Sequence, residues 1–216
     1  MISFLDLCEQ NSVEVLTTDY CSTQTKMDDS YSKNKAKGYI SFAAPNRELN
    51  IIPGYPMVPF NENNNNISAL KDAQNFLYLL NTENFANKEN FIQAVEETNY
   101  DVIILDLFFE GIEFSPLEIE RLKVKKNNGE RLVICYMSIG EAEDYRYYWN
   151  NLWHVGNPVW LREENPDWLG NYKVEYWEKE WQDIIYGNDN SYMKKILNTG
   201  FDGVYLDIID AFEYFE

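Results

Sequence analysis

The sequence is poor in histidine, cysteine and basic residues, and each scarcity argues against a class of function. His154 is the only histidine, which gives a Ser-His-Asp triad or a His-rich metal site little support. The three cysteines, Cys8, Cys21 and Cys135, have no metal-binding spacing and cannot all pair within one chain. Only 18 lysines and arginines accompany 36 aspartates and glutamates, so the net charge of −18 argues against a nucleic-acid partner.

Long apolar runs are missing as well. No run approaches the ~20 residues of a membrane-spanning helix, and residues 1–6 lack the basic start of a signal peptide. We therefore expect no membrane partner, and the residues alone do not indicate where the protein is located.

Aromatic residues, by contrast, are abundant. They make up 16% of the chain, with 16 tyrosines and 6 tryptophans, within a hydrophobic total of 45% that is typical of a globular protein. Such rings fit either the core of an α/β protein or the apolar faces of sugars, on which a ring stacks while its polar tip bonds a hydroxyl. The acidic excess likewise fits either a cationic partner, attracted by the field of the surface, or solubility alone.

Short apolar runs alternate with helical patterns along the chain, which predicts parallel strands joined by helices. Ser115 and Glu118 have the spacing of a capping box at a helix start. The Pro- and Asn-rich stretch 51–70 is typical of a linker, and 151–181 has the composition of an aromatic loop. Helices are expected over 88–97, 115–126 and 191–198, with a helix or turn over 142–149.

The apolar runs predict one parallel sheet. Its first strand and its last strand are expected to have open edges. Cys135 lies inside a strand and is expected to be a buried small hydrophobe. The predicted spatial order of the strands is 13–18, 39–44, 75–80, 102–108, 132–137 and 203–207.

Carboxylates stand at the ends of several of these strands. Asp207 follows the run Val204-Tyr205-Leu206, Asp106 ends the strand over 102–108, and Glu143 follows the strand over 132–137. In parallel α/β folds the carboxyl ends of the strands are where chemistry takes place, so one rim is expected to carry all three. An aspartate after a strand is also often no more than a helix N-cap.

Three longer motifs carry a resemblance to a known family. They are SIGEAEDYRYYW at 138–149, NPDWLGNYKVEYW at 165–177 and GFDGVYLDIIDAFEYF at 200–215. Over about residues 70–216 the chain resembles the bacterial branch of glycoside-hydrolase family 114. The resemblance implies an endo-α-1,4-polygalactosaminidase on a TIM-like (β/α)₈ barrel, without a cofactor, acting on a cationic galactosamine polymer. It also implies an extracellular or periplasmic location.

The resemblance covers only part of a barrel. Four strands follow the stretch 51–70, whereas a (β/α)₈ barrel has eight. Segments 13–21 and 38–49 resemble the last two strands of the same family's barrel. We therefore expect a partial (β/α)₈ barrel of about six parallel strands, divided into a tail over 1–50, a linker over 51–70 and the N-terminal half of a barrel over 71–216.

The resemblance also assigns roles to residues. Glycoside hydrolysis usually needs two carboxyl groups, and Asp207 matches the family's catalytic aspartate at the end of the fourth strand. The matching glutamate would lie beyond Glu216, so a half-barrel from another chain would have to supply it. For Glu141 and Asp144 a capping or surface ion-pair role is expected. The residues expected to bind substrate are Asp106, Glu143, Arg146, Trp149, Tyr172, Tyr176, Trp177 and Asp210.

Three other interpretations remain open on the sequence alone. A cleft lined by these acidic and aromatic side chains could bind carbohydrate without turnover, or the chain could be an inactive gene fragment. A metal-dependent hydrolase could instead use Asp106, Glu143 and Asp207 as oxygen ligands.

Overall fold

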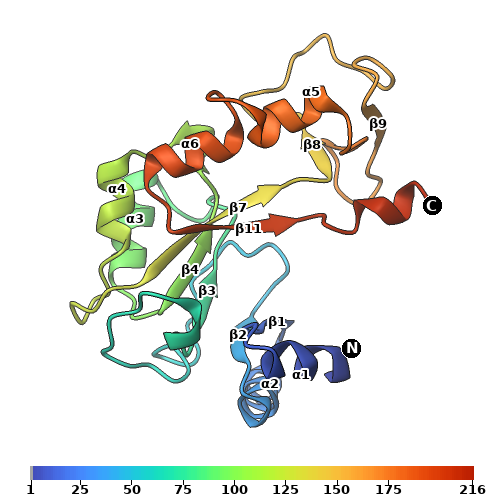
Figure 1. The fold of residues 1–216 in the computed structure, drawn as a ribbon. Coiled ribbons are helices and arrows are strands. Elements are labelled where there is room, and N and C mark those ends of the chain that lie inside the picture. The colour runs from blue at the N-terminus through green and yellow to red at the C-terminus, as the bar shows by residue number, and fades with distance from the viewer. Residues whose placement is uncertain (1) are drawn as a thin grey trace. The chain divides into compact units, whose positions relative to one another are not determined.

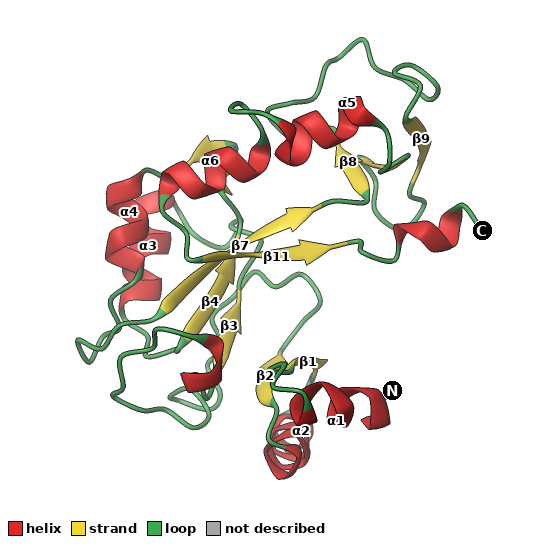
Figure 2. Cartoon of the chain, viewed as in Figure 1, coloured by secondary structure: helices red, strands yellow, loops and turns green. Residues whose placement is uncertain are grey.

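The computed structural model describes residues 2–216 as a mixed α/β chain (Figure 1, Figure 2). It divides into two compact units, which are described separately. The first contains the residues up to Asp106 together with Ser115–Ile134, and the second contains Leu107–Phe114 together with Cys135–Glu216.

Four of the predicted strands form one parallel sheet, and they follow each other in it in chain order. The strand β11 lies at one edge of this sheet and β3 at the other. Cys135 is fully buried in β7, as predicted. The four strands are β3 (Phe76–Tyr78), β4 (Val102–Leu105), β7 (Leu132–Ser138) and β11 (Gly203–Asp207).

The N-terminal segment forms a separate βα unit. Its two strands pair in parallel, from Leu16 opposite Ile40 to Tyr20 opposite Ala44. Thr23 caps the start of the intervening helix, and Gly38 ends it with a φ of 83°, a conformation that favours glycine. The elements are α1 (Ile2–Gln10), β1 (Leu16–Tyr20), α2 (Gln24–Lys37) and β2 (Ile40–Ala44).

A single parallel bridge, Ser41 to Asn75, connects β2 with the segment that leads into β3. The rings of Phe42 and Phe76 lie 5.6 Å apart next to it. The predicted neighbours therefore meet, but a continuous six-stranded sheet or a barrel is not confirmed. Pro45 directly follows β2, and because proline has no backbone N–H, it cannot donate a hydrogen bond to a neighbouring strand.

Residues 51–70 make specific hydrogen bonds within the first unit. Asn63 Nδ2 donates to Asp101 Oδ2 at 2.7 Å, and the amide of Glu130 donates to Asn66 Oδ1 at 3.0 Å. Lys125 Nζ lies 2.9 Å from Asp101 Oδ1, and both side chains are fully buried. The asparagine-rich run therefore helps to enclose a buried ion pair just before β4.

Two helices complete the first unit, α3 (Lys88–Glu96) and α4 (Pro116–Leu122), beside the short 3₁₀ turn η1 (Leu70–Asp72). The capping box of Ser115 and Glu118 is formed as predicted. The helix ends before 126 because Val124 forms an antiparallel bridge with Glu130 instead. No helix within residues 2–216 is long and apolar enough to cross a membrane.

The second unit differs most from the prediction. The expected helix or turn over 142–149 and the aromatic loop over 151–181 contain a three-stranded antiparallel sheet, in the order β8-β10-β9. The predicted strand over 102–108 is shorter and is followed by a hairpin. The elements are β5 (Phe108–Phe109), β6 (Ile112–Glu113), β8 (Glu141–Glu143), β9 (Leu161–Glu164), β10 (Asn171–Val174), α5 (Lys179–Gln182), the π-turn η2 (Asp183–Gly187), α6 (Tyr192–Thr199) and η3 (Ala211–Tyr214).

Candidate active site

Asp207 ends β11 and accepts a hydrogen bond from a tyrosine of the neighbouring strand β7. The hydroxyl of Tyr136 donates to Asp207 Oδ2 at 2.8 Å. The ring of Tyr136 stacks on Tyr205, with centroids 6.2 Å apart and planes at 20°. Because side chains two apart on a strand share a face, Tyr205 and Asp207 lie on the same side of β11. The structure therefore presents one carboxyl group that is hydrogen-bonded to one of two stacked tyrosines.

The backbone turns sharply after this carboxylate. Ile208 has a φ of 58°, a left-handed conformation that is unusual for a β-branched residue. The amide of Ile139 donates to the carbonyl of Asp207 at 3.1 Å. Strained backbone of this kind is concentrated at functional sites, where the surrounding structure maintains it.

Gly140 makes room for that turn. A Cβ atom at this position would lie 2.3 Å from the carbonyl oxygen of Ile208 and 2.5 Å from Cβ of Ala211. Only a glycine lets the loop after β7 approach the end of β11 this closely.

Replacing Gly140 with alanine should therefore lower the free energy of unfolding by about 1–3 kcal/mol, because the added methyl group overpacks this contact. Urea denaturation followed by circular dichroism measures the change. Gly54→Ala is the control, since a Cβ at Gly54 meets no atom within 4 Å. Equal stability of the two variants would contradict the proposed packing.

Glu143 and Arg146 form a buried ion pair. Arg146 Nε donates to Glu143 Oε2 at 2.5 Å, and the hydroxyl of Tyr145 donates to Glu143 Oε1 at 2.6 Å. The guanidinium group lies over the rings of Phe108, Tyr145 and Tyr192, 5.2–6.0 Å from their centroids. Both oxygens of Glu143 are therefore bonded within the protein, and the carboxylate orients the arginine.

Arg146→Lys should cost about 1.5–3 kcal/mol of stability, since a lysine keeps the charge but loses the planar donors and the ring contacts. Chemical denaturation measures this change, with Arg162→Lys as the control, because Arg162 is 37% exposed in its pair with Glu175 whereas Arg146 is 5% exposed. The result expected for Arg162→Lys is a small change. A similarly small change in stability for Arg146→Lys would show that the buried ion pair adds little to the free energy of unfolding.

Glu141 is buried, contrary to the expected surface role. Its Oε1 atom accepts from Lys173 Nζ at 2.5 Å and from Asn165 Nδ2 at 2.8 Å. Its Oε2 atom has no hydrogen-bond partner among the described residues. The β8–β10 register places Glu141 directly opposite Lys173, a long-range pairing that sequence spacing does not reveal.

The four predicted aromatic residues form two separate groups. Trp149 packs on Tyr172, with ring centroids 5.0 Å apart, whereas Tyr176 and Trp177 pack around Phe215. Of the remaining predicted residues, Asp210 is exposed at the start of η3. Asp106 directly follows β4 and belongs to the first unit.

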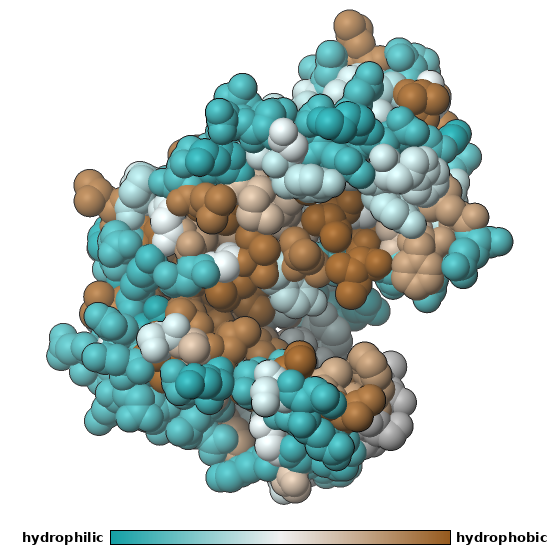
Figure 3. Space-filling view, viewed as in Figure 1, coloured by the Kyte–Doolittle hydropathy of each residue, from teal (hydrophilic) through white to brown (hydrophobic). Residues whose placement is uncertain are grey.

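The second unit also contains an apolar cavity of about 400 Å³ that sequence reasoning missed. It lies among β7, β11, α6 and the turn η2, and Figure 3 shows apolar side chains gathered over the position of β11. Leu206 and Ile209 beside it are 43% and 70% exposed, so the edge of the sheet is only partly covered. The residues that line the cavity include Met137, Ile139, Tyr176, Trp181, Met193 and Leu206.

Comparison with known proteins identifies the family. The model of glycoside-hydrolase family GH114 matches residues 60–216, which is most of the chain. The chain belongs to family GH114. Its resemblance to that family, indicated by the motifs around Glu143 and Asp207, is confirmed.

The curated relatives that the chain matches are longer than the chain itself. An uncharacterized protein of Methanocaldococcus jannaschii is 42% identical over 156 residues, which cover 71% of this chain and 41% of the relative. Uncharacterized proteins of Thermotoga maritima and Deinococcus radiodurans are 38% and 36% identical, each over 56% of this chain and over 36% and 37% of the relative. The chain therefore spans about two fifths of the length of the curated relatives it matches.

Within residues 2–216 no group of three or more histidine, cysteine, aspartate or glutamate side chains is arranged to hold a metal ion.

Proposed function

We propose that this GH114 chain is a glycoside hydrolase-like domain acting on α-1,4-linked galactosamine-type polysaccharide, with Asp207 as one of its two catalytic carboxyl groups. The observation that carries the proposal is the geometry at the end of β11. There the Tyr136 hydroxyl donates to Asp207 Oδ2 at 2.8 Å, and the strained turn at Ile208 follows directly. A charge-assisted hydrogen bond of this kind fixes the direction in which a carboxylate faces its substrate.

We further propose that a segment outside residues 1–216 supplies the second carboxyl group. The exposed edge at Leu206 and Ile209 leaves room for further βα units, and the matched relatives have additional length that such units could occupy. A half-barrel supplied in this way would complete the pair that glycoside hydrolysis requires.

The acidic surface supports a cationic substrate. With a net charge of −18, the chain attracts a polymer that carries free ammonium groups, and salt weakens this attraction by screening exposed charges.

The proposal is tested by following the release of reducing ends from free-amine polygalactosamine, its N-acetylated form and a neutral glucan. The protein is assayed alone and joined to the part of the Methanocaldococcus jannaschii relative that lies outside the matched region. Hydrolysis of the free-amine polymer by the joined protein, decreasing as salt increases, is expected. Binding without any hydrolysis in either form would favour the alternative of a carbohydrate-binding module, and neither binding nor hydrolysis would favour an inactive fragment.

Removing the hydroxyl that contacts the carboxylate should slow hydrolysis by about 10-fold in the joined protein, because one hydrogen bond to a charged group is lost. The variant is Tyr136→Phe, and Tyr205→Phe is the control because it removes a hydroxyl from the stacked neighbour. Initial rates of reducing-end release measure the effect. Equal rates for both variants would argue against a role for Tyr136 in positioning Asp207.

A further inference from the structure

A cluster of four aromatic rings lies at the surface of the second unit, and the sequence pointed to only two of them. Tyr176 and Trp177 follow β10, whereas Tyr214 ends the C-terminal turn η3 and Phe215 follows it. Tyr176, Trp177 and Tyr214 are 40–46% exposed. We call these four residues the aromatic platform.

The rings of the platform meet edge to face. The centroids of Trp177 and Phe215 lie 4.7 Å apart at 74°, and those of Tyr214 and Phe215 lie 4.7 Å apart at 87°. Tyr176 meets Trp177 at 5.0 Å and 82°. An edge-to-face contact leaves ring faces uncovered by the partner ring, so exposed ring faces remain available to a ligand.

The platform is held in place from both sides. Gln182 Nε2 donates to the backbone carbonyls of Tyr176 and Trp177 at 3.4 and 3.3 Å. Ala211 at the start of η3 is buried, next to Gly140. The rings are therefore set before a ligand arrives, which lowers the entropy cost of binding.

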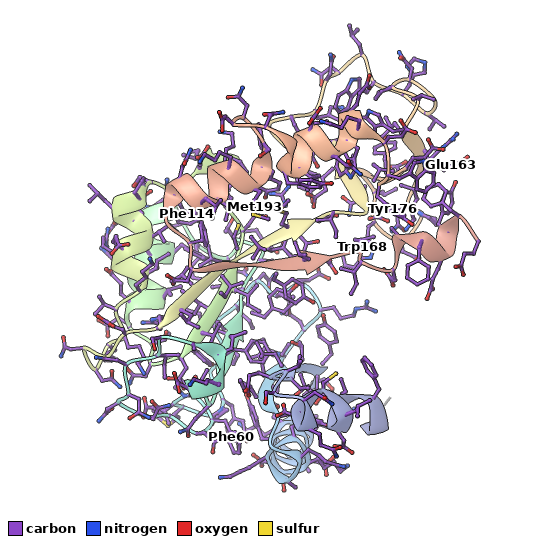
Figure 4. The ribbon with its side chains drawn as sticks, in the orientation of Figure 1. Phe60, Phe114, Glu163, Trp168, Tyr176 and Met193 are labelled. Atoms are coloured by element: carbon purple, nitrogen blue, oxygen red, sulfur yellow. The ribbon has the colours of Figure 1, made fainter. Side chains whose placement is uncertain are left out.

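Carboxylates border the platform. Glu163 accepts a hydrogen bond from the Tyr214 hydroxyl, and Figure 4 shows Glu163 and Tyr176 at the same end of the second unit. Three basic side chains lie close to Glu163 or to the platform in the sequence, and each is paired with a carboxylate, namely Arg162, Lys173 and Lys179. Further acidic residues adjoin the rings in the sequence, namely Glu178, Glu213 and Glu216.

We propose that the aromatic platform is a binding site for an amino-sugar unit that carries a free ammonium group. The apolar C–H face of the pyranose lies on an exposed ring, and the ammonium group faces Glu163. This assignment deepens the proposed function and rests on it for the class of substrate. Ring faces alone would bind neutral sugars equally well, whereas the flanking carboxylates favour a charged amine.

Isothermal titration calorimetry with a free-amine galactosamine oligosaccharide and its N-acetylated form tests the platform. The titrations use the present chain, with circular dichroism to confirm folding of each variant. Trp177→Ala and Phe215→Ala should each weaken binding of the free-amine oligosaccharide by about 3- to 10-fold. Trp177→Phe should recover part of the loss. Trp168→Ala is the control, because Trp168 is exposed to a similar degree but lies outside the platform.

Glu163→Gln should selectively remove the preference for the free amine, so that both oligosaccharides bind with similar affinity. The proposal is overturned if Trp177→Ala and Phe215→Ala bind like Trp168→Ala, or if the wild-type chain binds both oligosaccharides equally. It is also overturned if these variants alter the sedimentation of the chain rather than sugar binding, because the surface is then an interface between copies.

The outcomes separate the platform from the catalytic proposal. If the joined protein hydrolyses the polymer and the platform variants bind the oligosaccharide as the wild type does, only the proposal of a binding site at the platform is wrong. If those variants lose binding and no form of the protein hydrolyses the polymer, the binding site is supported and the catalytic proposal is wrong.

Discussion

Replacing Lys125 with methionine should lower the free energy of unfolding by about 3–5 kcal/mol, because it leaves the Asp101 carboxylate buried without its cation. The two side chains are fully buried, 2.9 Å apart, and Asp101 also accepts from Asn63 and from the amide of Gln74. Urea denaturation at neutral pH measures the change, with the slope checked to ensure that the transition stays two-state.

Lys126→Met is the matched control, since this neighbouring lysine pairs with Glu97 in the open, with side chains 57% and 70% exposed. The control should change stability by less than about 1 kcal/mol. Equal losses of stability in the two variants would mean that burial of the Lys125–Asp101 pair adds nothing to the free energy of unfolding.

Asp207→Asn should slow hydrolysis by about 10³-fold or more in the joined protein while binding of the polymer is largely kept. The substitution preserves the shape of the side chain but removes the charge and the proton-transfer capacity of a catalytic carboxyl group. Initial rates of reducing-end release and titration calorimetry give the two quantities.

Asp202→Asn serves as the control for this prediction, because Asp202 is exposed near the opposite end of β11. It should hydrolyse the polymer at nearly the wild-type rate. Retained hydrolysis in Asp207→Asn would remove Asp207 from the mechanism, and loss of binding as well would point to a structural role.

Local signals predicted much of the fold. The capping box at Ser115 forms because the residues that make it are only three positions apart. The apolar run that follows Gly203 predicts the last strand. The antiparallel sheet of β8, β9 and β10 was missed, since its pairing joins Glu141 to Lys173 across a long connection. The hydrophobic pattern of a few neighbouring residues does not show which distant strand they pair with.

The candidate site was only partly predictable for the same reason. Asp207 follows an apolar run, so its place at a strand end could be predicted from neighbouring residues alone. Its partner Tyr136 lies 71 residues earlier on another strand, and Phe215 meets Trp177 only through the fold. Glu141 looked like a surface acid because its sequence neighbours are acidic, whereas its burial depends on the cross-strand lysine.

A crystal structure of the Asp207→Asn chain with a free-amine galactosamine oligosaccharide tests the central claim most directly. The oligosaccharide is expected to cross the end of β11, with a glycosidic linkage within roughly 3–4 Å of the side chain at position 207. An oligosaccharide bound in the second unit without contact to that side chain would contradict it.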